Sequence, residues 1–302
     1  MLKLFKQALK VTNDSIILAI PLILFMWIIN FYSLFSRYTV DTFPEFILAT
    51  VTVLFMVGAF CAGWFYMIKE AISLSKKVFV LDEDRAKATF NLIKLIPAGI
   101  GKYFLSFVGM YIILFVLQIL VTFIVYSIGI NTIGVLDASS VEHLQAIATE
   151  QSQASDQAMV AFVNSLSVDQ IIFFGKWSML FVFVSSVAFF LIMLWFPEII
   201  YQSQNPILAL GRSIKKLFKT FFKSLGLYFN MWVIGFILLF INTFALINPI
   251  AYLVMSIVLF YYSVFVVVLL FLYYDVTFNC DKVVEETVVK KEDDTNNEES
   301  EE

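Results

Sequence analysis

Histidine is the side chain that most often serves as a general base or a zinc ligand, and this 302-residue sequence contains one, His143. A single histidine cannot form an H-E-x-x-H zinc motif. The sequence also contains no G-x-S-x-G nucleophile motif and no G-x-x-x-x-G-K-[ST] phosphate loop. We therefore expect a protein that is not an enzyme, that needs no cofactor or metal, and that has no nucleic-acid partner.

Composition indicates that lipid is the main solvent of this chain. Apolar residues make up 61% of the sequence, against roughly 45–50% for a soluble domain, and charged residues only 15%. The mean hydropathy is +0.88. Two cysteines, Cys61 and Cys280, cannot form a disulfide framework. These values predict a polytopic membrane protein.

Six apolar stretches are long enough to cross about 30 Å of hydrocarbon as helices, in which each backbone group is satisfied within its own segment. We expect an all-α fold, a bundle of six transmembrane helices with amphipathic interfacial helices on the cytoplasmic side. The predicted spans are approximately residues 15–35, 46–68, 103–128, 177–200, 227–247 and 250–272. Together with their connections they form a domain over residues 1–275, with an outer loop at 131–176.

Helix boundaries are predicted from residues that favour helix ends. Asn248 before Pro249 and Asn205 before Pro206 are typical of an N-cap followed by the first helical residue. The pattern Ser167-x-x-Gln170 predicts a capping box that starts the fourth helix before its hydrocarbon portion. A break is expected ahead of the third span, at Pro97, Gly99 and Gly101.

Lysine and arginine predict the orientation, because cytoplasmic loops retain positive charge. With the N-terminus inside, 18 of the 20 basic residues fall on the inner side, and only Arg37 and Lys176 fall outside. We therefore expect the protein to lie in a bacterial cell membrane, with both termini cytoplasmic. The first span is too long for a signal peptide and lacks a small-x-small cleavage site, so we expect it to be retained.

The strongest amphipathic pattern extends from Asn205 to Leu225. We expect one helix here along the inner interface, with an apolar face and a basic face. The basic residues are Arg212, Lys215, Lys216, Lys219 and Lys223. They could bind anionic lipid headgroups, at on the order of 1 kcal/mol each, or they could serve only to orient the protein.

Charge is scarce within the spans. Glu198, beside Pro197, should lie at the inner end of span four, either as an interfacial residue or as part of a cavity or gate. Neutral polar residues lie deeper, and they could hydrogen-bond between helices or line a small polar passage. The candidates for that passage are Gln118, Ser185, Glu198, Asn242 and Tyr261.

Small residues and aromatic residues in the spans predict where helices pack and where the protein meets the membrane interfaces. Gly58, Ala59 and Gly63 form a small-residue patch where another helix can approach span two. Aromatic residues near span ends are expected to anchor the protein at the interfaces. They are Trp64, Trp177, Trp195, Tyr201, Tyr273 and Tyr274.

Outside the spans, the sequence predicts short helices in the outer loop and disorder at the C-terminus. Ser139-x-x-Glu142 and a following apolar set predict two short helices in the outer loop. Residues 276–302 contain ten acidic residues and three lysines, and from Asp281 onward no aromatic residue, which predicts a disordered cytoplasmic tail. The tail could make the protein more soluble or bind a cytoplasmic protein.

The run from Trp195 to Tyr201, followed by Asn205-Pro206 and by Ala-Leu-Gly-Arg-Ser at 209–213, resembles several bacterial integral membrane families. The membrane domain attached to some glycerophosphodiester phosphodiesterases is one of them. The resemblance covers about a third of the chain. The catalytic barrel of those enzymes, with its metal-binding acids and histidines, is absent here, so the resemblance implies no phosphodiesterase activity.

Two functions from different classes fit these observations. The first is a non-enzymatic membrane protein whose basic inner helices bind the lipid surface and whose acidic tail is open to a partner. The second is a facilitator or permease subunit that moves a neutral or weakly polar solute through the bundle. A continuous crevice lined by Gln118, Ser185, Asn242 and Tyr261 would favour transport.

Overall fold

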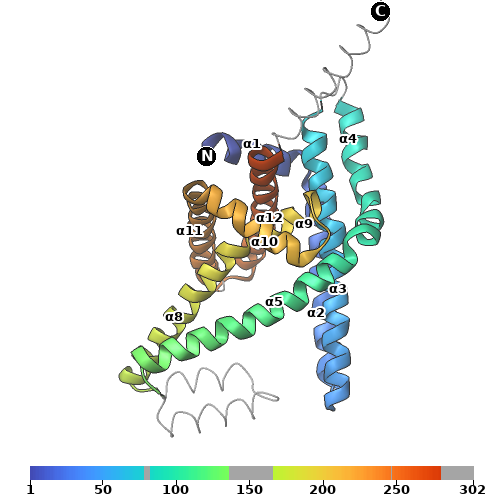
Figure 1. Ribbon diagram of the computed structural model, residues 1–302. Helices are drawn as coiled ribbons and strands as arrows, with labels where there is room; N and C mark the ends of the chain where they lie inside the picture. Colours follow the sequence, from blue (N-terminus) through green and yellow to red (C-terminus); the bar gives the residue numbers. More distant parts are fainter. Residues whose placement is uncertain (78–81, 136–165, 246, 280–302) are drawn as a thin grey trace, which may run out of the picture. The chain divides into compact units, whose positions relative to one another are not determined.

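The computed structural model describes residues 1–77, 82–135, 166–245 and 247–279 (Figure 1). All secondary structure in these residues is helical. Within them, six helical stretches are long and apolar enough to cross a membrane. They are Ile16–Ser36, Phe43–Ser75, Glu83–Thr132, Val168–Tyr201, Phe221–Ala245 and Pro249–Asn279. The prediction of an all-α chain with six potential spans is confirmed, and the protein is a multi-pass membrane protein.

The described chain forms two compact units. The first contains residues 1–112 and 192–279, and the second contains residues 113–191 where they are described. The expected outer-loop helices and the acidic tail after Asn279 lie outside the described residues. The first unit therefore joins two segments that are far apart in the sequence.

The N-terminal segment of the first unit begins with α1 (Leu2–Asp14), a 3-10 turn η1 (Ile16–Leu18) and α2 (Ala19–Thr39). A short connection leads into α3 (Phe43–Ser75). This helix starts with a capping box in which the Glu45 carboxylate accepts from the Thr42 backbone N–H at 2.8 Å. The pattern Thr42-x-x-Glu45 is visible in the sequence but was not among our predictions.

The same segment continues through α4 (Asp82–Asn91), η2 (Leu92–Leu95) and the start of α5 (Ile96–Thr132). The break expected at Pro97, Gly99 and Gly101 is wrong, because all three lie inside α5. Proline is tolerated in a first helical turn, where its missing N–H has no helical partner to lose. The irregular stretch lies just earlier, in η2.

A close crossing between α3 and α5 confirms the predicted small-residue patch. A Cβ added to Gly99 would lie 2.8 Å from the Ala62 carbonyl oxygen and 3.0 Å from the Gly63 Cα. A Cβ on Gly63 would lie 2.7 Å from a side-chain carbon of Ile96. The two backbones can approach this closely because both helices carry glycine at the crossing.

The C-terminal segment contains α9 (Trp195–Tyr201), α10 (Pro206–Lys219), α11 (Phe221–Ala245) and α12 (Pro249–Tyr274). A π-helical turn, η3 (Asp275–Asn279), continues α12. The expected caps are confirmed, since Oδ1 of Asn248 accepts from Ile250 N–H at 2.9 Å and Oδ1 of Asn205 accepts from Ile207 N–H at 3.0 Å.

The core of the first unit lies between the two segments. Helix α12 contacts α1, α2, α3, α9 and α11, and Figure 1 shows α1 at one end of it. The Phe65 ring of α3 lies with centroids 5.4–5.5 Å from the rings of Phe107, Phe196 and Phe271. Apolar burial is concentrated here, and many apolar side chains elsewhere on the spans are exposed, as expected where lipid is the solvent.

The second unit pairs residues 113–135, most of them in α5, with α8 (Val168–Ile192). The capping box expected at the start of α8 is confirmed, because the Gln170 side chain accepts from Ser167 N–H at 2.9 Å. A Cβ added to Gly129 would lie 2.2 Å from the Trp177 ring, so glycine leaves space for this indole. Trp177 therefore packs against a helix as well as lying near a span end.

Candidate functional site

A buried charged cluster joins three helices of the first unit. Oε2 of Glu198, on α9, accepts from Lys216 Nζ of α10 at 2.7 Å and from the Tyr274 hydroxyl of α12 at 2.5 Å. The Glu198 side chain is completely buried, and that of Lys216 is 20% exposed. The ammonium group also lies 4.7 Å from the centre of the Tyr274 ring. We call Glu198, Lys216 and Tyr274 the anchor cluster.

Local sequence explains how Glu198 and Lys216 reach the cluster. Helix α8 ends at Ile192, and α9 starts separately at Trp195 with Pro197 in its first turns. The Asn205 cap then starts α10, and the Trp195 indole N–H donates to the Pro206 carbonyl at 2.8 Å. This bond fastens the beginning of α9 to the beginning of α10, so Glu198 and Lys216 face each other.

The charges of the anchor cluster stabilise the packing of α10 against α9 and α12. Removing a carboxylate from water is costly, and here an ammonium and a phenol hydroxyl compensate one of its oxygens. The other oxygen, Oε1, is buried with no hydrogen-bond partner among the described residues. No described group of three or more His, Cys, Asp or Glu side chains could hold a metal ion. What the cluster can do chemically is hold α10 against α9 and α12.

Aromatic and ionic contacts surround the anchor cluster. The Tyr201 ring stacks on Tyr274 with centroids 5.4 Å apart, and Lys69 Nζ lies 5.6 Å from the Tyr201 ring centre. Lys76, at the end of α3, pairs with Asp275 of η3. The same end of the first unit is therefore tied together by charges from four elements.

The expectation that span-end aromatics are interface anchors is wrong for several of them. Trp195 and Tyr274 are fully buried, and Trp64 and Tyr273 nearly so. Their polar atoms bond within the protein: Trp64 donates to the Leu18 carbonyl at 2.8 Å, and the Tyr273 hydroxyl lies 2.9 Å from that of Ser224. Buried Trp and Tyr side chains need such partners, so they fix tertiary structure here.

The basic residues of the predicted amphipathic helix do not act as one set. The helix ends at Lys219, and Lys223 belongs to α11, so the continuous helix expected from Asn205 to Leu225 is wrong. Arg212, Lys215, Lys219 and Lys223 are exposed. Lys216 differs because it turns toward Glu198. The side of α10 that packs on the protein contains Ala209, Ser213 and Leu217, all fully buried.

The residues predicted to line a polar passage are distributed over both units. Gln118 and Ser185 belong to the second unit, where Gln118 is exposed. Glu198, Asn242 and Tyr261 belong to the first unit. Glu198 lies in the anchor cluster, and the Tyr261 hydroxyl donates to Asn13 Oδ1 at 2.5 Å. Glu198 and Tyr261 thus bond to different partners, and the passage stays a prediction.

Three of these residues have buried polar atoms without a hydrogen-bond partner in the described part of the chain: Ser185 Oγ, Glu198 Oε1 and Asn242 Oδ1. No family model, curated protein or solved structure matches this chain. Its function is therefore inferred from the anchor cluster, from the exposed cations and from the cavities of the first unit.

Proposed function

We propose that this non-enzymatic multi-pass membrane protein binds anionic lipid headgroups through the exposed cations of α10 and the start of α11. The observation that carries the proposal is the contrast within one helix: Lys216 is held inward by Glu198, while Arg212, Lys215 and Lys219 are exposed. If these cations served only to orient the chain, each would need to lie on the cytoplasmic side of the membrane. Whether it is exposed or paired with a buried carboxylate would make no difference.

The anchor cluster would make the binding surface rigid. Because α10 is tied to α9 and α12, its exposed cations need little further ordering when they meet headgroups. Four cations at on the order of 1 kcal/mol each contribute about 4 kcal/mol near an anionic leaflet. Ile207, Leu208 and Phe218 of the same helix are exposed, so apolar contacts with the headgroup and acyl boundary would add to this.

The proposal also includes the orientation of the chain in the membrane and a partner for its acidic tail. Both termini would lie in the cytoplasm, because the basic connections then share one side of the membrane. The acidic tail would then be available to a cytoplasmic protein with a basic surface.

Lipid binding by the purified full-length chain tests the proposal. Delipidated protein is titrated with phosphatidylglycerol in detergent, and bound lipid is counted by native mass spectrometry. The triple variant Arg212→Gln, Lys215→Gln and Lys219→Gln should bind this lipid at least about tenfold more weakly, and its binding should depend less on salt.

A charge-matched control replaces three lysines of the tail, Lys282, Lys290 and Lys291, with Gln. This variant should bind like the wild type. Equal binding by wild type and the α10 variant would reject the proposal. Equal binding together with a larger fraction of inverted molecules would show that the α10 cations serve only to orient the chain.

A further inference from the structure

A second feature of the first unit, separate from α10, is a cavity of about 700 Å³ between α1, η1, α2, α4 and α12. Its size is within the range of small-molecule sites, roughly 300–1,000 Å³. All of its lining residues belong to the first unit, and most are apolar. The apolar wall includes Ile17, Ile20, Ile23, Ile257, Phe260 and Val264.

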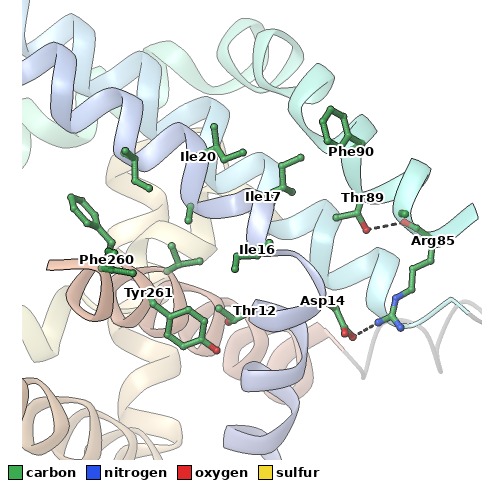
Figure 2. Close-up of a pocket in the computed structure, with 15 residues that line it drawn as sticks. Thr12, Asp14, Ile16, Ile17, Ile20, Arg85, Thr89, Phe90, Phe260 and Tyr261 are labelled. Atoms are coloured by element: carbon green, nitrogen blue, oxygen red, sulfur yellow. Dashed lines mark hydrogen bonds and ion pairs between the residues drawn. The ribbon is translucent and has the colours of Figure 1, made fainter. Parts of the chain in front are cut away.

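One side of this cavity is charged. Arg85 of α4 and Asp14 of α1 form an ion pair, and Figure 2 shows this pair at one side of the cavity with Phe260 at the other. The Arg85 and Asp14 side chains are 37% and 26% exposed, so both remain accessible. Thr12 and Thr89 also line the cavity.

The charged and apolar lining residues follow one another along the start of the first apolar stretch. Asp14 precedes the first span, and the lining residues Ile16, Ile20 and Ile23 follow it along the beginning of that span. At 1.5 Å per residue the distance from Ile16 to Ile23 along the helix is about 10 Å. Along α2, the charged side therefore lies where the first apolar stretch begins, and the apolar wall continues into that stretch.

From these observations we infer that the cavity binds one bilayer phospholipid with a zwitterionic headgroup. The apolar wall contacts the part of an acyl chain nearest the headgroup. Arg85 takes the phosphate, because a guanidinium has five N–H donors and one carboxylate does not use them all. Asp14 takes the ammonium group through its carboxylate. The pair carries no net charge, so it matches a headgroup with both charges better than an anionic headgroup, whose single charge Asp14 would repel.

This inference concerns another part of the first unit than the proposed function, and a lipid headgroup of different net charge. The α10 surface would attract anionic headgroups and depend on salt, whereas this cavity would prefer phosphatidylethanolamine over phosphatidylglycerol with the same acyl chains. Neutralising Arg212, Lys215 and Lys219 should therefore leave retention of phosphatidylethanolamine unchanged. Failure of either proposal can be recognised without the other.

The test fills the cavity and measures the lipid that stays bound to the full-length protein in native mass spectrometry. Ala86, which is exposed on α4 and lines the cavity, is changed to Phe. The affinity for phosphatidylethanolamine should fall about tenfold. The matched control is Ala98→Phe, at an exposed alanine of α5 outside the lining, and it should bind like the wild type. Ile257→Phe, at a lining residue of α12, repeats the test should Ala86→Phe fail to fold.

A second arm examines the headgroup. The double variant Arg85→Gln and Asp14→Asn should still bind phospholipid but lose the preference for phosphatidylethanolamine over phosphatidylglycerol. Equal retention by Ala86→Phe, Ile257→Phe and Ala98→Phe would overturn the site. A wild-type preference for phosphatidylglycerol that Ala86→Phe abolishes would overturn the assignment of a zwitterionic headgroup.

Discussion

The ammonium group of Lys216 lies 2.7 Å from the buried carboxylate of Glu198. Together with the buried side chains of Ala209, Ser213 and Leu217, the pair fixes which way α10 faces, with one cation of the helix inward and the others exposed. A pattern of charges along the helix would otherwise be compatible with several rotations about its axis. This ion pair connects the fold of the first unit to the surface that we propose for lipid binding.

The variant Lys216→Met should lower the free energy of unfolding by about 3 kcal/mol, because it leaves the buried carboxylate of Glu198 without its cation. The double variant Lys216→Met with Glu198→Gln removes both charges and should be more stable than the single variant. Denaturation in mixed micelles measures both. A double variant less stable than Lys216→Met would contradict the compensation described for the anchor cluster.

Substitution of Gly99 tests the crossing of α3 and α5. The variant Gly99→Ala places a methyl group 2.8 Å from both the Ala62 carbonyl oxygen and the Tyr66 Cβ, and should cost about 1–3 kcal/mol of unfolding free energy. Gly101→Ala is the control, since a Cβ there meets nothing within 4 Å. That change should raise stability by roughly 0.5–1 kcal/mol through helix propensity. Similar thermal midpoints for the two variants would be inconsistent with a tight crossing.

Removal of the cap at the start of α10 should weaken the helix that carries the exposed cations. Asn205→Ala loses the bonds from Oδ1 to the N–H groups of Ile207 and Leu208, at 3.0 and 3.2 Å, and should cost about 1 kcal/mol. Asn205→Ser retains a cap and should cost much less. Hydrogen exchange of the first turn of α10 measures the effect locally, and equal exchange in both variants would speak against a role for the cap.

Orientation can be tested by labelling single cysteines in cells, after Cys61→Ala and Cys280→Ala. A cysteine at Ala148 should react with an impermeant maleimide in intact cells, because residues 131–175 of the outer loop contain no Lys or Arg. A cysteine at Ser300 should react only after lysis. The reverse pattern would place both termini outside and would remove α10 from the cytoplasmic leaflet.

Helix ends could be predicted from the sequence because their determinants are local. Asn248, Asn205 and Ser167 each bond to backbone or side-chain atoms no more than three residues away. The spans could be predicted for a related reason, since the length and apolarity of one segment decide whether it can cross a bilayer. Tertiary structure is not needed for either inference.

The anchor cluster could not be predicted in the same way. The sequence predicts Glu198 at the inner end of span four, as an interfacial residue or as part of a cavity or gate, whereas its side chain is buried and its partners lie 18 and 76 residues further along the chain. Nothing in the local pattern around Glu198 indicates which lysine or tyrosine it meets. Likewise, an aromatic residue near a span end has the same local sequence whether it contacts headgroups or, like Trp195, packs in the core.

The arrangement of α1 against α12 has a consequence for biosynthesis. The ring of Phe5, near the N-terminus, packs 6.0 Å from that of Phe265 in the last span. A ribosome that adds 5–20 residues per second needs on the order of 10–50 s to make the intervening chain. Throughout that interval α1 lacks its contact with α12, so α1 can reach its final position only after the last span has been translated.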